Sequence, residues 1–389
     1  MQVDDRPDHR SSAERVLENV WDGKFHTTST LMELTGHSRS TVIKACDELI
    51  ARRWIRRSSG DLSEGRKAMG RPENRYALRS EAGVVVGVDA GPHRIAVRVA
   101  DLVGVTVSDA SVEAPSGRSR CADWVRIIEG TVLGALEVTT APVLSVSVGT
   151  PARVDEREAL PQGEVDLWQS LHRSLQARFS ARSWPSVFEN DANLAAIACT
   201  AMTDSANFIT LLSRETLGAG IILGGQLLRG AYGRAGNLLL LRSITDVGST
   251  EGITSLIGRW AGEGGFHVAG KQSASNDESS RQDQLDALLA AVVSGDRGAA
   301  MILDRLGVRF GLVLATLAGI LDVDAIVLAG APGPALEEIL RRATPTARGI
   351  VGPLLPRLLA SVEGEGIVVA GAVSSALTMM RSRAFTTAL

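Results

Sequence analysis

Residues 39 to 44 place an arginine, two hydroxyl side chains and a lysine close together along the chain. These four residues are Arg39, Ser40, Thr41 and Lys44. An arginine can hydrogen-bond to a guanine edge or bind a phosphate, and serine and threonine hydroxyls can donate to either. A lysine at this position suits a phosphate contact better. This combination of side chains therefore predicts contacts with nucleic acid.

A helix has to present these side chains on one surface. Apolar residues follow them at helical intervals and form one stripe, made of Val42, Ile43, Cys46, Leu49 and Ile50. This spacing predicts a helix that buries the stripe and turns the polar cluster outward. Ser38 is placed to cap its first turn.

Two shorter helices are predicted before it. Ser11-Ser12-Ala13-Glu14 has the spacing of a capping box, and the apolar residues Val16, Leu17, Val20 and Trp21 continue until Gly23. Thr28 to Leu34 predicts a second helix, with Leu31 and Leu34 inward and Gly36 at its end. Two helices, a turn and a third helix with a polar N-terminal end are typical of a helix-turn-helix domain that reads the major groove.

A basic segment follows the third helix. Four arginines flank Trp54 and Ile55, and residues 58 to 69 are polar and contain glycines, as a β-wing would. Gly70-Arg71-Pro72 then closes the segment. Arg71 on such an extended turn can reach into a minor groove, although an ordinary linker ending in proline is the alternative.

Charge is distributed unevenly along the chain. The formal net charge is −3, yet residues 39 to 79 carry 11 Lys and Arg against 5 Asp and Glu. A local basic excess on an acidic protein indicates a polyanion-binding surface, although on charge alone it could be a solvated face. Cys46, Cys121 and Cys199 are few and far apart, so we expect buried small residues and neither disulfides nor a metal site. No apolar stretch is long enough to span a bilayer, which predicts a cytoplasmic protein without a membrane partner.

Beyond Arg79 the sequence changes to runs of β-branched residues and glycines. This change places a domain boundary near residue 80. Val84 to Asp89 predicts a buried strand, Ala90 to His93 a turn, and Ile95 to Val99 a second strand. Val105 to Val107 continues the meander. We therefore expect residues 1–80 to form the DNA-binding domain and a different domain to begin there.

Several short motifs later in the chain occur in an order that resembles the ROK family (repressor, open reading frame, kinase). The resemblance covers nearly all of residues 10 to 380, and its most specific element is the Asn-Asp-Ala-Asn block. The motifs are Asp89-x-Gly91, Gly149-Thr150-Pro151, Glu189-Asn190-Asp191-Ala192-Asn193, Gly218-Ala219-Gly220, Arg229-Gly230-Ala231 with Ala235-Gly236, and Ile326-Val327-Leu328-Ala329-Gly330.

This resemblance implies the fold class. It predicts an N-terminal winged helix-turn-helix followed by a two-lobed α/β body of the actin-like, ribonuclease-H-like sugar-kinase fold, with a sugar held between the lobes. We expect the lobes at residues 81–194 and 195–389, with the C-terminal helix returning to the first lobe. The N-terminal extension places the chain with the family's regulators, because its free-standing sugar kinases lack it.

The resemblance also allows kinase chemistry to be tested residue by residue. The family kinases use the aspartate at the position of Asp191 as general base, but they also need donors around the phosphates. Here Pro92 lacks the N–H that a phosphate would use, and Glu215 puts a carboxylate where phosphates are expected. The segment that faces adenine in the family kinases has fewer glycines here, where it reads Ala329-Gly330-Ala331. We therefore predict no enzyme activity, no cofactor, and only a vestigial role for Asp191.

The sugar pocket is altered in the same way. The family's Gly-Glu-x-Gly-His segment reads Gly236-Asn237-Leu238-Leu239-Leu240, and its cysteine-rich zinc module has no cysteine here, so no metal is expected. By resemblance, candidate effector-binding residues are Asn190, Asp191, Asn237 and Glu251. Asn190 and Asp191 precede a helix, so helix capping is the equally weighted alternative.

Long helical periodicity in Leu285 to Val293 and Ala299 to Leu321 suits covering a sheet and pairing with a second subunit. A homodimer, or a dimer of dimers, would bind two half-sites of a double-stranded DNA operator. We thus expect a repressor that responds to a sugar or sugar-derived effector. A regulator without ligand input, or an active sugar kinase, are the alternatives.

Overall fold

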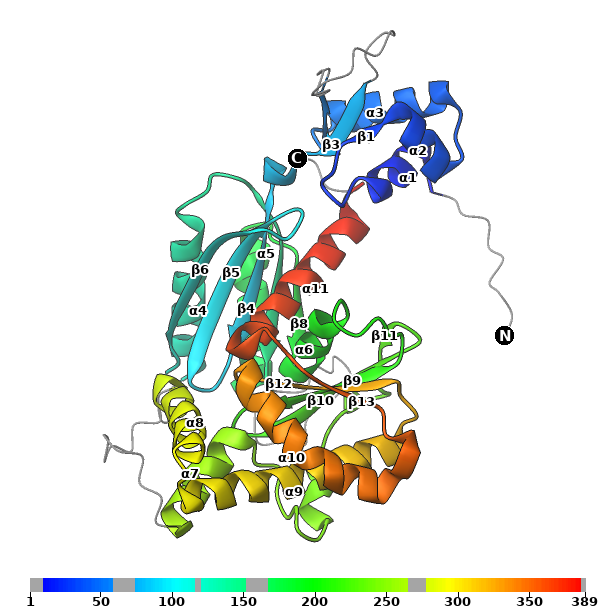
Figure 1. Cartoon of the computed structure of the whole chain (residues 1–389). Helices are drawn as coiled ribbons and strands as arrows, with labels where there is room; N and C mark the ends of the chain where they lie inside the picture. The colour runs from blue at the N-terminus through cyan, green and yellow to red at the C-terminus, as the bar shows by residue number, and fades with distance from the viewer. Residues whose placement is uncertain (1–9, 59–73, 116–119, 152–166, 265–277, 386–389) are drawn as a thin grey trace.

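The computed structural model describes residues 10–58, 74–115, 120–151, 167–264 and 278–385. Figure 1 shows a small N-terminal part above a larger body with two β-sheets, one above the other. Each sheet of the body has five strands. Among the described residues, no helix combines the length and the apolar composition that crossing a bilayer requires.

Three helices begin the chain: α1 (Ser12–Asn19), α2 (Thr28–Thr35) and α3 (Arg39–Ala51). The predicted capping box is confirmed, because the Ser11 hydroxyl accepts from the Glu14 N–H while the Glu14 carboxylate accepts from the Ser11 N–H. Gly36 ends α2 at a φ of 69°, a left-handed conformation that glycine adopts without strain. Ser38 caps α3 through the Thr41 N–H, as predicted.

One prediction for α2 is wrong. Leu31 is fully buried, but the side chain of Leu34 is 52% exposed. Thr35 takes the inward position of the last turn instead, and its hydroxyl donates to the carbonyl of Leu31 at 2.6 Å. In a helix of eight residues the inward face contains few positions, and the spacing of four from Leu31 to Thr35 fits that face better than the spacing of three to Leu34.

A three-stranded antiparallel sheet closes the N-terminal part. It contains β1 (His26–Thr27), β2 (Ile55–Ser58) and β3 (Arg75–Leu78), in the order β1-β3-β2. Ile55 pairs with Leu78 and Ser58 with Arg75, so β2 and β3 run antiparallel to one another. The wing predicted beyond Ser58, and Gly70-Arg71-Pro72 with it, lies outside the described residues.

The first sheet of the body has the order β6-β5-β4-β7-β8. Its strands are β4 (Val84–Ala90), β5 (Arg94–Asp101), β6 (Thr106–Glu113), β7 (Val143–Thr150) and β8 (Ser186–Asn190). β4 is buried on both faces. Val84, Val86 and Val88 join a core with α4 (Cys121–Leu136) and α5 (Leu167–Ala181), whereas the alternate residues Val85 and Gly87 lie against α11 (Ile367–Arg383).

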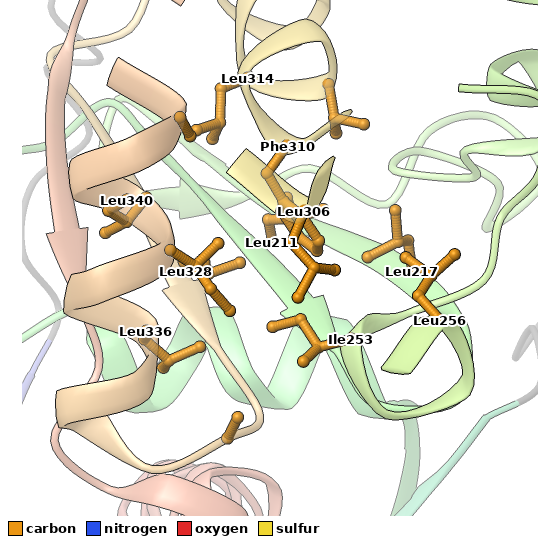
Figure 2. Close-up of a cluster of buried hydrophobic side chains, with 14 of the residues drawn as sticks. Leu211, Leu217, Ile253, Leu256, Leu306, Phe310, Leu314, Leu328, Leu336 and Leu340 are labelled. Atoms are coloured by element: carbon orange, nitrogen blue, oxygen red, sulfur yellow. The ribbon is translucent and has the colours of Figure 1, made fainter. Parts of the chain in front are cut away.

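The second sheet has the order β11-β10-β9-β12-β13. Its strands are β9 (Phe208–Ser213), β10 (Leu217–Leu223), β11 (Gln226–Leu227), β12 (Ala325–Ala329) and β13 (Arg357–Ala360). Four helices contribute to the core on one face: α7 (Ile253–Gly264), α8 (Glu278–Val293), α9 (Arg297–Ile320) and α10 (Gly333–Val351). Figure 2 shows this core, where Leu306 and Phe310 of α9 lie near Leu211 of β9.

Helix α11 connects the body to the N-terminal part. Its first half packs with α6 (Asp191–Cys199), and a Cβ at Gly371 would lie 1.9 Å from the carbonyl oxygen of Leu194. Its second half enters the N-terminal core, where Leu377 and Met380 share a cluster with Leu17 and Trp54. In Figure 1 this helix runs from the centre of the body to the N-terminal helices. Helix α11 therefore packs into both the body and the core of the N-terminal part.

Candidate functional site

A cavity of about 730 Å³ lies between the two sheets of the body, a volume that suits a small-molecule ligand. Its lining includes the junction of β8 and α6 and the loops on either side of β10. Its polar and charged lining comes from both halves and includes His93, Gln169, Asn190, Asp191, Asn193, Arg214, Glu215, Arg234, Asn237 and Arg242.

Asn190 lies at the junction of β8 and α6. Its side-chain oxygen accepts from the N–H of Ala192 at 3.0 Å and of Asn193 at 3.3 Å, so it is the N-cap of α6. The capping interpretation is confirmed for this residue, yet the same residue also lines the cavity. The two interpretations are therefore compatible, because the cap fixes the direction in which the rest of the side chain is presented.

Asp191 is the first residue of α6 and also lines the cavity. Burial raises the pKa of its carboxyl group to about 6, and the nearby Arg214 opposes part of that effect. The carboxylates of Asp89 and Glu215 add to the rise in pKa. This group can therefore change its charge in the pH range in which most proteins work.

Glu189, which is buried, links Asn193 of α6 to Arg229. Its carboxylate accepts from the side-chain amide of Asn193 at 2.8 Å and forms an ion pair with Arg229 at 2.7 Å. Two of the motifs noted in the sequence, separated by 40 positions, thus meet in one network. No role was assigned to Arg229 from the sequence. Its partner Glu189 is 40 positions away, so no local sequence pattern indicates the pair.

The two loops that would hold nucleotide phosphates in a kinase contact one another. Arg214 donates to both oxygens of Asp89, at 2.6 and 3.3 Å, and to the carbonyl of Glu365 at 3.1 Å. Beside this pair, His93 and Glu215 are 3.6 Å apart. Opposite charges from the two halves of the body therefore pair directly.

Asn237 and Glu251 differ in their placement. Asn237 lines the cavity, and its side-chain oxygen accepts from the Leu239 N–H at 3.1 Å. The Glu251 carboxylate instead accepts from the Ser249 hydroxyl at 2.8 Å and pairs with Arg259 at 2.9 Å, and Glu251 is not part of the cavity wall. The predicted contact of Glu251 with an effector stays a prediction, and in this structure its carboxylate is engaged by Ser249 and by Arg259 of α7.

Several cavity residues were not anticipated from the sequence. Arg234 and Arg242 flank the Gly236-Asn237 segment, and Trp168 stacks edge-on against Trp124 with ring centroids 5.2 Å apart. Their positions depend on how the loops fold back over the cavity. For Arg234 and Arg242, the one local signal was their position in sequence near the Gly236-Asn237 segment.

The polar end of α3 is the second candidate site. Arg39, Ser40 and Lys44 are exposed, whereas Thr41 is half-buried and its hydroxyl lies 2.9 Å from that of Ser38. Arg39, Ser40 and Lys44 are thus available to a large ligand, and Thr41 supports the cap of α3.

Known proteins are similar to this chain over most of its length. Residues 85–344 match the ROK family. A putative xylose repressor of Caldicellulosiruptor sp. (strain Rt8B.4) is 23% identical over 348 residues, which cover 84% of this chain and 85% of that protein. A glucokinase of Streptomyces coelicolor is 28% identical over 171 residues, 42% of this chain and 51% of the relative.

Solved structures give the same fold. A ROK family transcriptional regulator, described as a homologue of the E. coli MLC protein, has a TM-score of 0.67 at 18% identity and covers 95% of this chain and 98% of its own. A ROK family glucokinase from Streptomyces griseus, solved with glucose and AMPPNP, has a TM-score of 0.60 at 25% identity, over 76% of this chain and 100% of its own. The kinase thus matches a smaller part of this chain than the regulator does.

Proposed function

Since the chain belongs to the ROK family, we propose that it is a DNA-binding transcriptional repressor whose sugar-kinase-like body binds a sugar effector without phosphorylating it. Xylose repressors are among its relatives, and one of them aligns over 84% of the chain.

Three helices and a small sheet before residue 80 support the DNA-binding part of the proposal. In the proposed winged helix-turn-helix, α3 lies in the major groove. Arg39 and Ser40 then contact bases or phosphates, and Lys44 contacts a phosphate. Thr41 positions the start of the helix, and Arg71 belongs to the proposed wing.

The ion pair between Arg214 and Asp89 is the observation that carries the proposal of a non-catalytic body. Phosphoryl transfer depends on donors and cations arranged around the phosphates of the nucleotide. Here the guanidinium that would attract a phosphate is already bound to a carboxylate, and Glu215 adds a repulsive charge beside it. A bound ATP would have to break this pair.

The cavity residues support a sugar as the effector. Asn190, Asp191 and Asn237 present amide and carboxyl groups, which pair with hydroxyl groups by donating and accepting. The relatives described as xylose repressors and the glucokinase solved with glucose point to a pentose or a hexose. No metal and no cofactor take part in this mechanism.

Coupling between the two sites is proposed to run through α11. One end of this helix follows Glu365, whose carbonyl accepts from Arg214 at the cavity, and the other end packs against Trp54 and Leu17 of the N-terminal part. A sugar that changes how the two halves of the body close would tilt α11 and shift the proposed recognition helices of a homodimer relative to the half-sites.

The test is to purify the full chain, select bound fragments from sheared genomic DNA, and measure mobility shifts on the selected site. We expect a palindromic site that Arg39→Ala binds weakly, that Arg348→Ala binds like the parent because this residue is exposed on α10, and that one sugar releases. Turnover of xylose or glucose with ATP would favour the kinase. Specific DNA binding that no sugar changes would leave a regulator without ligand input.

A further inference from the structure

A second cavity lies on the far side of the loop that forms one wall of the first. Its volume is about 490 Å³, and it is lined by residues 246 to 249 and by side chains of α7 and α9. Three of the helical side chains are arginines, Arg259, Arg305 and Arg309, against one carboxylate, that of Asp246. Arg259 also pairs with the Glu251 carboxylate, which lies outside the lining, so Arg305 and Arg309 supply the positive charge of the lining that exceeds the negative charge of Asp246.

Two buried N–H donors in this lining have no partner among the described residues. Trp260 is 4% exposed and Arg309 is 3% exposed, and the indole Nε1 and the guanidinium Nε each lack a hydrogen bond there. Buried donors without acceptors are uncommon in folded proteins because leaving one unpaired costs free energy. An acceptor that enters the cavity and reaches these two groups would satisfy them.

The cations near the entrance are held in place by the same indole. The guanidinium of Arg305 stacks over the Trp260 ring at 4.2 Å, and that of Arg259 lies 5.8 Å from the ring centroid. Both residues are exposed, whereas Trp260 and Arg309 are buried. The cavity is therefore lined by two exposed arginines and by two buried side chains that carry N–H donors.

From this arrangement we propose that the cavity between α7 and α9 binds an oxyanion, the phosphate or carboxylate group of a small metabolite. Arginine donors match the geometry of such groups, and charge-assisted bonds of this kind are among the strongest in proteins. A macromolecule would not reach Arg309 or Trp260, because both are recessed. Burial lowers the pKa of the Arg309 guanidinium, and an anion would offset that cost.

This second site shares a wall with the first cavity. Arg309 donates to the carbonyl oxygens of Val247, Ser249 and Glu251, the last two at 2.7 and 3.1 Å. Thr250, between these residues, lines the first cavity, and its carbonyl accepts from the Leu217 N–H at 2.7 Å. An anion bound by Arg309 and Arg305 would therefore fix one wall of the larger cavity.

Calorimetry on the full chain tests the proposal without reference to DNA, so its outcome is independent of the proposed function. Sodium phosphate and sodium gluconate are titrated separately against sodium chloride at equal ionic strength, because phosphate also stabilises proteins nonspecifically. We expect saturable binding of one anion per chain. Phosphate binding alone indicates a phosphate-bearing ligand, and gluconate binding indicates a carboxylate.

Variants locate the binding. Arg305→Gln is expected to weaken the anion at least about tenfold, since it removes one charge-assisted bond. Trp260→Phe, which keeps the buried ring and removes the Nε1 donor, should also weaken it. Arg297→Gln is the control, because this arginine is exposed on the same helix and outside the cavity. The proposal is overturned if neither anion binds saturably, or if Arg305→Gln binds as the parent does.

Discussion

The guanidinium of Arg214 donates to both carboxylate oxygens of Asp89, across the junction of the two halves of the body. Only 12% and 7% of the two side chains are exposed. A buried ion pair contributes modestly to stability as a whole, but losing one partner leaves the other charge buried without compensation. This pair therefore resists separation of the segments that contain Asp89 and Arg214.

Arg214→Gln is expected to lower the free energy of unfolding by about 3 kcal/mol, because Asp89 is left as an isolated buried carboxylate. Urea denaturation at neutral pH measures the change. The double variant Arg214→Gln with Asp89→Asn should recover much of the loss. Arg94→Gln is the control, since its side chain is 41% exposed in the pair with Glu365 and should cost far less. Equal losses for Arg214→Gln and Arg94→Gln would contradict the expectation.

Operator binding should separate the roles of two residues on α3. Lys44→Ala is expected to weaken binding on all sequences alike and to reduce the slope of log affinity against log salt by about 1, because one phosphate contact is lost. Arg39→Ala should cost about 1 to 3 kcal/mol and relax the preference for one base pair if Arg39 contacts a guanine. Fluorescence anisotropy over a range of salt concentrations measures both effects.

Arg348→Ala is the control for these measurements, since this residue is exposed. It belongs to α10, which lies in the lower part of the body in Figure 1, away from the N-terminal helices. If Lys44→Ala left the salt slope unchanged, the proposed placement of α3 in the groove would be wrong. If Arg39→Ala changed affinity equally on every sequence, Arg39 would be a phosphate contact.

Gly236 is expected to be essential for the first cavity. Its φ is +80°, and a Cβ there would lie 1.7 Å from the carbonyl oxygen of Ala219. Gly236→Ala should therefore displace the neighbouring Asn237 and abolish sugar binding, as measured by calorimetry with the sugar that releases the operator. Gly224→Ala is the matched control, because its φ is +58° with no atom within 4 Å of the added Cβ. Undiminished sugar binding by Gly236→Ala would show that this segment does not form the binding wall.

Local sequence patterns predicted the elements well where short-range chemistry determines them. The Ser11 capping box, the end of α2 at Gly36 and the Ser38 cap each depend on residues within three or four positions, and all are confirmed. Leu34 was assigned to the wrong face because a helix of eight residues contains too few periods to define its inward direction.

The cavity was predictable only in part. Asn190 and Asp191 line it as the motif indicated, because the turn from β8 into α6 is a local feature. The pairing of Arg214 with Asp89 was not predicted, since 125 positions separate the two residues and only the folded sheets bring them together. Glu251 does not line the cavity, and its carboxylate pairs with Arg259 of α7, a helix that was not predicted from the sequence.

The pKa of Asp191 predicts a pH-dependent contribution to stability. Its carboxyl group has a pKa of about 6 in the folded protein, above the ordinary aspartate pKa of 3.8, because burial disfavours the charged form. Between these two values the folded state binds the proton more tightly than the unfolded state does. The contribution of this group to the free energy of unfolding therefore falls as the pH rises from about 4 to about 6.

Asp191→Asn removes this titration while retaining an oxygen that can accept from the Ala192 N–H. We expect the variant to be more stable than the parent by about 1 to 3 kcal/mol at pH 8, where the parent carries a charge that is partly removed from water. The difference should vanish near pH 4, where Asp191 is protonated in the parent. Urea denaturation from pH 4 to 8 measures the gap, with Asp109→Asn, an exposed carboxylate paired with Arg98, as the control. A gap that stays constant with pH would mean that Asp191 is not buried as a charge, and the cavity would then be open to water at this point.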